Sequence, residues 1–209
     1  MRLLLTLLTA ALFTNVTAAQ ATEAIGTIAS LKGTLTRVSD EPNTPLKAGD
    51  EIYKLDRLKV GEAGLAEINF KDETSLTLAE NTILEIDEYS YTIDDVENNS
   101  AEFSITQGAF KYVSGLISKT KEPDVKLNLD FGSIGIRGTK IWRDLKEDED
   151  GQMMCRIYVE DGKADVFNEN GRVTLGHMDG TKIKGLTAAP TEAEQWGEAA
   201  IEEIKSQTR

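Results

Sequence analysis

One glycine-rich stretch carries the strongest structural information in this sequence, and it reads Asp130-Phe131-Gly132-Ser133-Ile134-Gly135-Ile136-Arg137-Gly138-Thr139-Lys140-Ile141-Trp142-Arg143-Asp144. Glycine recurs at every third position from residue 132 to residue 138. A helix is disfavoured here, because each interior glycine costs about 0.8–1 kcal/mol relative to alanine. Without a Cβ, glycine lets two backbones approach closely or adopt a positive φ. The stretch therefore predicts a tight strand–turn–strand crossing, with Ile134, Ile136 and Ile141 available for a core.

Arg137 lies in the middle of this stretch and is its only long charged side chain before Lys140. One interpretation is an exposed guanidinium that a tight turn presents to a carboxylate of a partner. The other is a buried or half-buried arginine that ties neighbouring backbones together through its five donors and an acidic neighbour. We favour the structural interpretation, because the residue is wedged into a glycine-rich crossing. Its substitution is then expected to break folding rather than activity.

Short strands are predicted along most of the chain. Alternating apolar residues such as Ala66, Ile68 and Phe70 share one face by the period of two that a strand imposes. The segment Asn168-Glu169-Asn170-Gly171 predicts a hairpin turn, since Asn-Gly favours positive φ. Many short strands with glycine-marked turns indicate an all-β fold. The pattern alone leaves sandwich, barrel and solenoid open.

Part of the glycine-rich stretch also forms a family-like motif. Gly135-Ile136-Arg137-Gly138-Thr139, followed by an aromatic strand, resembles the hallmark of the FecR-like domain family, which is named for the periplasmic regulator of ferric citrate uptake. Residues 46–50, 56–61, 66–72 and 159–166 resemble further motifs of that family, in the same order. The resemblance covers roughly residues 25–185 and implies a β-solenoid-like coiled sheet, in which the glycines mark a close approach of two coils. The family's Asp-Gly-Ser turn is replaced here by Asp72-Glu73-Thr74.

The C-terminal segment has a helical pattern. Thr191-Glu192-Ala193-Glu194 matches a capping box, which opens a helix. One helical face then carries Ala193, Trp196, Ala200, Ile201 and Ile204. We expect this helix to pack on the β domain; the alternative is a detached helix that binds a partner.

The N-terminus predicts export. A basic start, Met1-Arg2, precedes the mostly apolar residues 3–13 and the small residues of Ala19-Gln20-Ala21, which match a cleavable signal peptide. The apolar run is shorter than the ~20 residues of a membrane span; an uncleaved anchor is the alternative. We expect cleavage after Ala21, a periplasmic or secreted protein, and no integral membrane segment after cleavage. The predicted division is a signal peptide (1–21), a FecR-like β domain (22–188) and a C-terminal amphipathic helix (189–209).

The charge balance limits the possible partners. The net charge is −13, and removal of residues 1–21 with their single arginine makes it −14. Nucleic acid is excluded as a partner, because binding its phosphates requires clustered lysine and arginine. Adhesion to anionic lipid is disfavoured for the same reason. The only cysteine, Cys155, permits no internal disulfide and is expected to fill a small space in the core.

Few residues suggest catalysis. His177 is the only histidine and has no second soft ligand for zinc. Ser114 and Ser133 lack the context of a nucleophile elbow. The acid-rich segments 87–99 and 146–151 contain oxygen ligands that a cation could use, but their spacing matches no known calcium loop. We expect a solvated acidic strand with a turn at 87–99 and a hairpin tip at 146–151. We therefore predict no catalytic, metal or cofactor site and no enzyme.

Two functional hypotheses follow. The first is an exported, non-catalytic binding or scaffold module of the bacterial envelope, which recognises an envelope or extracellular protein or another envelope ligand. The resemblance implies sigma-factor regulation, which we expect to be missing here, because the sequence contains no cytoplasmic anti-sigma segment and no internal membrane helix. The second hypothesis is an exported carboxylate-based hydrolase acting on a glycan, since carboxylates are abundant. The oligomeric state is not predicted.

Overall fold

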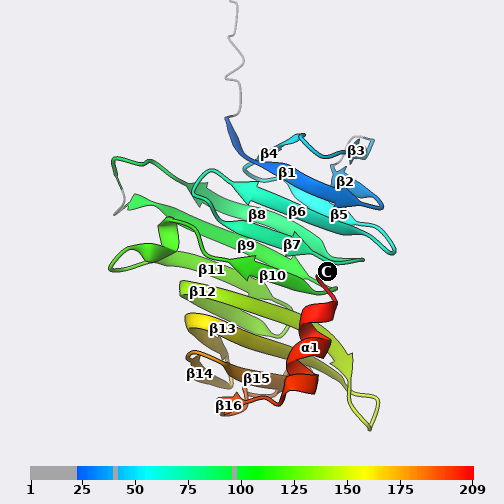
Figure 1. The fold of residues 1–209 in the computed structure, drawn as a ribbon, viewed down its shortest axis with the longest axis vertical. Helices are drawn as coiled ribbons and strands as arrows, with labels where there is room; N and C mark the ends of the chain where they lie inside the picture. Colours follow the sequence, from blue (N-terminus) through cyan, green and yellow to red (C-terminus); the bar gives the residue numbers. More distant parts are fainter. Residues whose placement is uncertain (1–22, 40–41, 96–97) are drawn as a thin grey trace, which may run out of the picture.

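The computed structural model describes residues 23–39, 42–95 and 98–209. The predicted signal peptide lies outside the described residues. Strands make up 56% of the structure and form a strongly curled half-barrel (Figure 1). The predicted all-β, solenoid-like coiled sheet of many short strands with one C-terminal helix is therefore confirmed.

The first eight strands are β1 (Ala24–Lys32), β2 (Leu35–Val38), β3 (Thr44–Leu46), β4 (Glu51–Tyr53), β5 (Arg57–Val60), β6 (Leu65–Phe70), β7 (Ser75–Leu78) and β8 (Ile83–Ser90). The others are β9 (Ser100–Thr106), β10 (Phe110–Val113), β11 (Asp124–Leu129), β12 (Gly132–Glu147), β13 (Met153–Asn168), β14 (Gly171–Leu175), β15 (Asp179–Lys184) and β16 (Glu194–Gln195). A 3-10 helix, η2 (Ile117–Lys119), precedes β11, and α1 (Glu198–Ser206) follows β16.

All strands belong to one sheet. Its path runs β3-β2-β5-β8-β9-β11-β12-β10-β7-β6-β1-β4, and β13 extends it from β12 to β14, β15 and β16. The two ends of this path, β3 and β4, are short strands joined by residues 47–50, at the top of Figure 1. The longest pairing joins β12 to β13, and it positions the motif that the sequence singled out.

The curl of the sheet encloses one apolar core. Alternate residues of the strands point inward and are fully buried, as Leu76 and Leu78 of β7 and Leu84 and Ile86 of β8 illustrate. Ile134, Ile136 and Ile141 are buried in the same cluster, as predicted. Cys155 is buried there as well, and this burial raises the pKa of its thiol.

The predicted strand–turn–strand crossing is wrong. Gly132 to Glu147 is one continuous strand whose pairing with β13 shifts register between Arg137 and Ile141. The predicted close approach is nevertheless present at this irregularity, where Gly138 (φ +62) faces Gly162 (φ +84). A Cβ on Gly162 would lie 1.9 Å from the carbonyl oxygen of Gly138. A β-bulge therefore takes the place of the expected turn.

The two predicted hairpin tips are confirmed. β13 and β14 pair antiparallel across Asn168 and Gly171, although neither Asn170 nor Gly171 has the positive φ that the Asn-Gly pair favours. The side chain of Asn168 accepts hydrogen bonds from the turn's backbone instead. The acid-rich residues 146–151 lie at the tip between β12 and β13, where Asp148 accepts from backbone N–H groups.

The predicted start of the C-terminal helix is wrong. α1 begins at Glu198, after Gly197 as the N-cap, whereas Glu194 and Gln195 form a short strand beside β15. The hydroxyl of Thr191 accepts a hydrogen bond from the backbone N–H of Lys182 (3.0 Å), and the carbonyl of Thr191 accepts one from the Thr181 hydroxyl (2.7 Å). These bonds tie residue 191 to β15, so it cannot cap a helix.

The predicted packing of α1 on the β domain is confirmed. Ile204 is fully buried against Trp142 of β12 and Tyr158 of β13, and Ile201, Trp196 and Met178 complete this small cluster. Tyr158 and Trp196 stack with ring centroids 5.8 Å apart. In Figure 1, α1 lies across the lower strands of the sheet.

Candidate functional site

Strand alternation divides the motif Gly135–Thr139 between two faces of the sheet. Ile136 points inward and is buried, whereas Arg137 points outward and is exposed. Thr139 is buried after the bulge, and its backbone N–H donates to the hydroxyl oxygen of Ser114 (2.7 Å). The part of the motif that a ligand can reach is therefore the outer face around Gly135 and Arg137.

The structure places Arg137 at the surface rather than in the expected buried or half-buried position, beside the acidic neighbour that was expected. Its side chain is 61% exposed, and its contact with a charged group is an ion pair from Nε to Oδ2 of Asp165 at 3.5 Å. No backbone carbonyl of the described residues accepts a hydrogen bond from the Arg137 side chain, so the residue does not tie backbones together. The guanidinium retains donors that are free to bind a ligand.

Polar side chains support this outer face on both sides of β12. On β11, Asn128 donates to Glu102 of β9 (2.7 Å) and accepts from the hydroxyl of Ser133 (3.0 Å). Lys126 also donates to Glu102 (3.1 Å). Hydrogen bonds from Asn128 and Lys126 lower the pKa of Glu102. These bonds fix the outward side chains of three adjacent strands.

The opposite side of Arg137 is held by Asp165 of β13. Its Oδ1 accepts from the hydroxyl of Thr174 on β14 (2.6 Å), which leaves Oδ2 facing Arg137. Between these residues, a Cβ added to Gly135 would meet only atoms of Asp165, at 3.9 and 4.0 Å. We define the motif face as Asn128, Ser133, Gly135, Arg137 and Asp165. It is a polar surface whose exposed cation, Arg137, lies opposite a second exposed cation, Lys163 of β13, in the register of the sheet.

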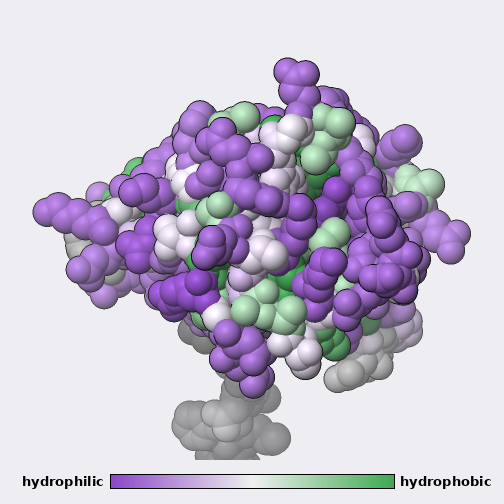
Figure 2. All heavy atoms as spheres, turned by 90° about the horizontal axis from the view of Figure 1, so that it is seen from below, coloured by the Kyte–Doolittle hydropathy of each residue, from purple (hydrophilic) through white to green (hydrophobic). Residues whose placement is uncertain are grey.

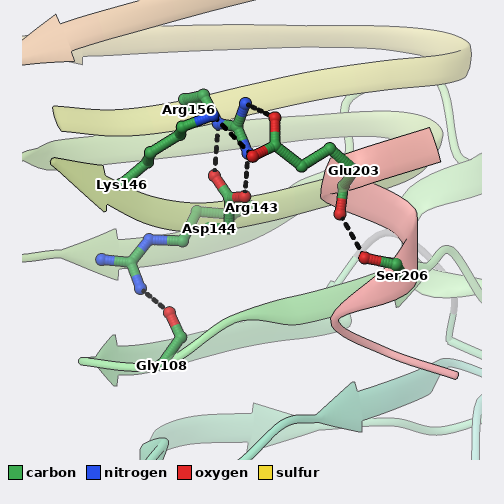
Figure 3. Close-up of polar contacts among 7 residues, drawn as sticks. All are labelled: Gly108, Arg143, Asp144, Lys146, Arg156, Glu203 and Ser206. Carbon is green, nitrogen blue, oxygen red and sulfur yellow. Dashed lines mark hydrogen bonds and ion pairs between the residues drawn. The ribbon is translucent and has the colours of Figure 1, made fainter. Parts of the chain in front are cut away.

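The arginine that ties backbones together is Arg143, which sequence reasoning missed. It is fully buried, and its Nη1 donates to the carbonyl oxygens of Gln107 (2.9 Å) and Gly108 (2.7 Å), as Figure 3 shows for Gly108. A signal for this was present in the sequence. Ile134 and Ile136 lie two positions apart, an even spacing, but Ile136 and Ile141 lie five positions apart, an odd spacing. A bulge between them reverses the strand's parity and turns Arg143 inward.

A second buried arginine, Arg156, joins the sheet to α1. Its Nε donates to Oδ1 of Asp144 (2.9 Å), its Nη2 contacts Oδ2 of the same carboxylate, and its Nη1 donates to Glu203 of α1 (2.9 Å). Lys146 also donates to Glu203 (2.5 Å) (Figure 3). These cations hold the pKa of Glu203 below its usual value, with Lys146 the larger cause. The network is structural, because each charge is matched by a partner within the protein.

The predicted acidic segments hold side chains that already have partners. Asp87 accepts from Ser104 (2.7 Å), and Glu88 pairs with Lys54 (2.6 Å). Within residues 23–39, 42–95 and 98–209, no cluster of histidine, cysteine and acidic side chains could hold a metal ion. His177 is exposed, with Nδ1 3.8 Å from the carboxylate of Asp161.

Comparison with known families identifies the fold. The family model described as FecR protein matches residues 56–165, and this match covers more than half of the chain. The chain belongs to the FecR family. No curated protein matches the sequence. FecR domains are regulatory domains of the periplasmic side. Among the residues that the structure describes, no helix is long and apolar enough to cross a membrane.

Two solved structures resemble this FecR protein. Both are candidate anti-sigma factors from Parabacteroides distasonis ATCC 8503, determined at 2.50 and 1.65 Å resolution. The first has a TM-score of 0.53 and 11% identity over 70% of this chain and 63% of that chain. The second has a TM-score of 0.52 and 12% identity over 69% of this chain and 62% of that chain. At this identity the likeness concerns the fold, and the chain spans less than two thirds of their length.

The FecR match includes the turn in which this sequence departs from the family-like Asp-Gly-Ser pattern. Asp72 is buried and accepts hydrogen bonds from the hydroxyls of Thr74 (2.7 Å) and Tyr89 (3.1 Å). Glu73 adopts a positive φ of 70°. Because glycine adopts this conformation without strain, the departure places glutamate in a glycine position. The turn in this chain therefore carries a local conformational cost at Glu73.

Proposed function

We propose that this FecR protein is an exported, non-catalytic binding or scaffold module of the bacterial envelope, and that it recognises a protein of the envelope through the motif face. The observation that carries the proposal is the exposure of Arg137. Folding would need no arginine at position 137 of the FecR motif, since the Arg137 guanidinium reaches only one carboxylate, that of Asp165, at 3.5 Å. An exposed guanidinium on a β-sheet, with donors that no group of the protein uses, suits recognition of a carboxylate on a partner.

The form of the surface supports a polar contact. Of the exposed large apolar residues, Met153 begins β13, and Leu55, Ile93 and Leu186 lie in three different turns. Leu186 comes near Met153, because the N–H of Gly185 donates to the Met153 carbonyl (2.9 Å). Figure 2 shows the end of the molecule below α1 as a mostly hydrophilic surface with small apolar patches. A large apolar patch is the usual mark of an obligate interface. A polar, reversible contact fits this surface better.

The glycan hydrolase is the weaker alternative. Such an enzyme needs one carboxylic acid whose pKa is raised, so that it can donate a proton at neutral pH. Among the described residues, each carboxyl group whose pKa departs from the ordinary value has it lowered, by hydrogen bonds and neighbouring cations. This pattern supports a non-enzymatic function.

The proposal leaves out sigma-factor regulation. The structural relatives that suggest it share 11–12% identity with this chain, which relates the folds alone. A binding module of the same fold can serve another partner, because function resides in the site rather than in the fold.

A photo-crosslinking experiment tests the proposal. A photoreactive amino acid replaces Gly135 in living cells, which keeps Arg137; a Cβ at Gly135 would meet only atoms of Asp165, at 3.9 and 4.0 Å. The control position is Lys59, an exposed residue of β5. We expect a discrete crosslinked envelope protein from position 135 only. In a pull-down, Arg137→Ala should lose this protein, whereas Arg57→Ala should retain it, since Arg57 is also exposed and pairs with one carboxylate, Glu85, at 3.1 Å. Equal crosslinking from positions 135 and 59, or none from 135, would overturn the proposal.

A further inference from the structure

A small pocket of about 240 Å³ lies where the C-terminal part of α1 meets β10, β12 and β13. We call it the lysine pocket, and its lining residues are Lys111, Lys140, Trp142, Glu160, Lys205, Thr208 and Arg209. None of these residues belongs to the motif face. The pocket brings cations together from two strands and one helix, in a protein whose net charge is −13.

The cations of this pocket outnumber its acids. Lys140 pairs with Oε2 of Glu160 at 2.7 Å, and Lys205 contacts Oε1 of the same carboxylate. Arg209 is neutralised by Glu202, with Nη1 to Oε2 at 2.9 Å. Three lysines facing one glutamate leave a net charge of +2 in the pocket.

Lys111 accounts for much of this excess. It lies on β10, directly opposite Trp142 in the register of the sheet, and it is half-buried. Among the residues that the structure describes, it has no ion pair or side-chain hydrogen bond. A half-buried ammonium without a counterion keeps its full capacity to bind an anion, since no internal carboxylate must first be displaced.

The other two lysines are held in place by aromatic rings. The Nζ of Lys140 lies 5.2 Å from the centre of the Trp142 ring, and that of Lys205 lies 4.8 Å from the same ring and 5.5 Å from the ring of Tyr158. The side chain of Lys205 is only 14% exposed. These contacts order the long side chains before a ligand arrives, which lowers the entropy cost of binding.

The acidic character of the whole protein does not prevent anion binding here. At physiological ionic strength the Debye length is about 8 Å, so exposed acids farther away than this are largely screened. At contact distance the three ammonium groups dominate. The local charge of +2 therefore decides the sign of the ligand.

We propose that the lysine pocket binds the phosphate group of a phosphate monoester, with Lys111, Lys140 and Lys205 as its ligands. A monoester carries close to two negative charges above pH 7, which match the excess charge of the pocket. Lysine binds phosphate as a compact point charge and does not need the planar fork of arginine. This site is separate from the motif face, and it stands whether or not the envelope function holds.

Titration calorimetry of the full chain with glycerol 3-phosphate tests this proposal, with inorganic phosphate as a second ligand and sodium chloride at matched ionic strength as the blank. We expect saturable binding of the monoester. Lys111→Gln should weaken it roughly tenfold, the effect of one charge-assisted hydrogen bond. Lys59→Gln is the matched control, because Lys59 is an exposed lysine on β5, far along the sheet. It should bind like the wild type.

Lys140→Gln is a second variant in case Lys111→Gln fails to fold, which a thermal melt checks; it should also weaken binding of the monoester. Three results would overturn the proposal. One is heat no greater than that of the chloride blank. Another is an equal loss of affinity in Lys59→Gln. The third is saturable binding of inorganic phosphate without binding of the monoester, which would show a site for a free ion.

Discussion

Backbone conformation at single residues determines how tightly β12 and β13 can pair. Gly162→Ala should lower the free energy of unfolding by about 3 kcal/mol, because the added Cβ would overlap the Gly138 carbonyl and strain a positive φ. Gly49→Ala is the control: its φ is also positive (+89°), but nothing lies within 4 Å of the added Cβ. It should lose about 1 kcal/mol. Urea unfolding measures both, and equal losses would contradict a close approach of the two strands.

The turn at Asp72–Thr74 gives a prediction of opposite sign. Glu73→Gly should relieve about 1–2 kcal/mol of left-handed strain and lose about 0.4–1 kcal/mol through a more flexible unfolded chain, for a net gain of about 0.5–1 kcal/mol. The control is Glu169→Gly, in the turn after β13. Glu169 has no positive φ, so glycine relieves no strain there and should lower the free energy of unfolding. A loss of stability in Glu73→Gly would contradict this account of the turn.

At the scale of the element, the attachment of α1 depends on pH through Glu203. The charged groups around the contact form ion pairs. Lys146 and Arg156 both pair with Glu203, Arg156 also pairs with Asp144, and Lys205 pairs with Glu160. The pKa of Glu203 is below 4.5 in the folded state. Its contribution to stability is thus complete above the unfolded value near 4.5 and is lost as the pH falls through the folded value.

Glu203→Gln should therefore weaken the docking of α1 at neutral pH by about 0.5–1 kcal/mol, a modest figure because the carboxylate is partly exposed. On acidification, α1 should detach less in Glu203→Gln than in the wild type, because the variant has no carboxylate at this position to protonate. Tryptophan fluorescence measures the docking of α1, since Trp142 and Trp196 lie in the contact between α1 and the sheet. Glu202→Gln, in the same helix but paired with Arg209, should behave as the wild type does. An identical response of both variants would show that Glu203 does not hold the helix.

The elements also show what the sequence could and could not predict. Alternation and glycine punctuation were sufficient for the all-β class and for both hairpin tips, because these signals are local, but the same glycines led to a turn being predicted inside the continuous strand β12. The start of α1 was missed because Thr191 found partners on β15, which no local pattern reveals. The outward position of Arg137 follows from alternation with Ile134 and Ile136, which the expected glycine-rich crossing obscured. The role of Arg143 was missed, because the bulge between Arg137 and Ile141 reverses the alternation and turns Arg143 inward. The FecR motif itself was recognisable from the residues alone.

At the scale of the whole molecule, the predicted export can be tested directly. Expressed in a Gram-negative host, the protein should be recovered from the periplasmic fraction with Thr22 as its first residue, which N-terminal sequencing would show. A positive charge at the cleavage site, as in Ala21→Arg, should block processing, because signal peptidase reads small residues there. Recovery of the intact chain from the cytosol would contradict the prediction.

The short strands β3 and β4 at the top of the sheet have a consequence for behaviour at high concentration. A long, flat terminal strand would offer unpaired N–H and C=O groups on which another sheet could grow into a fibre. Here each terminal strand has only three residues, and Pro45 removes a donor from β3. This end of the coil is therefore a poor template for polymerisation, so the molecules can crowd together here without joining sheet to sheet.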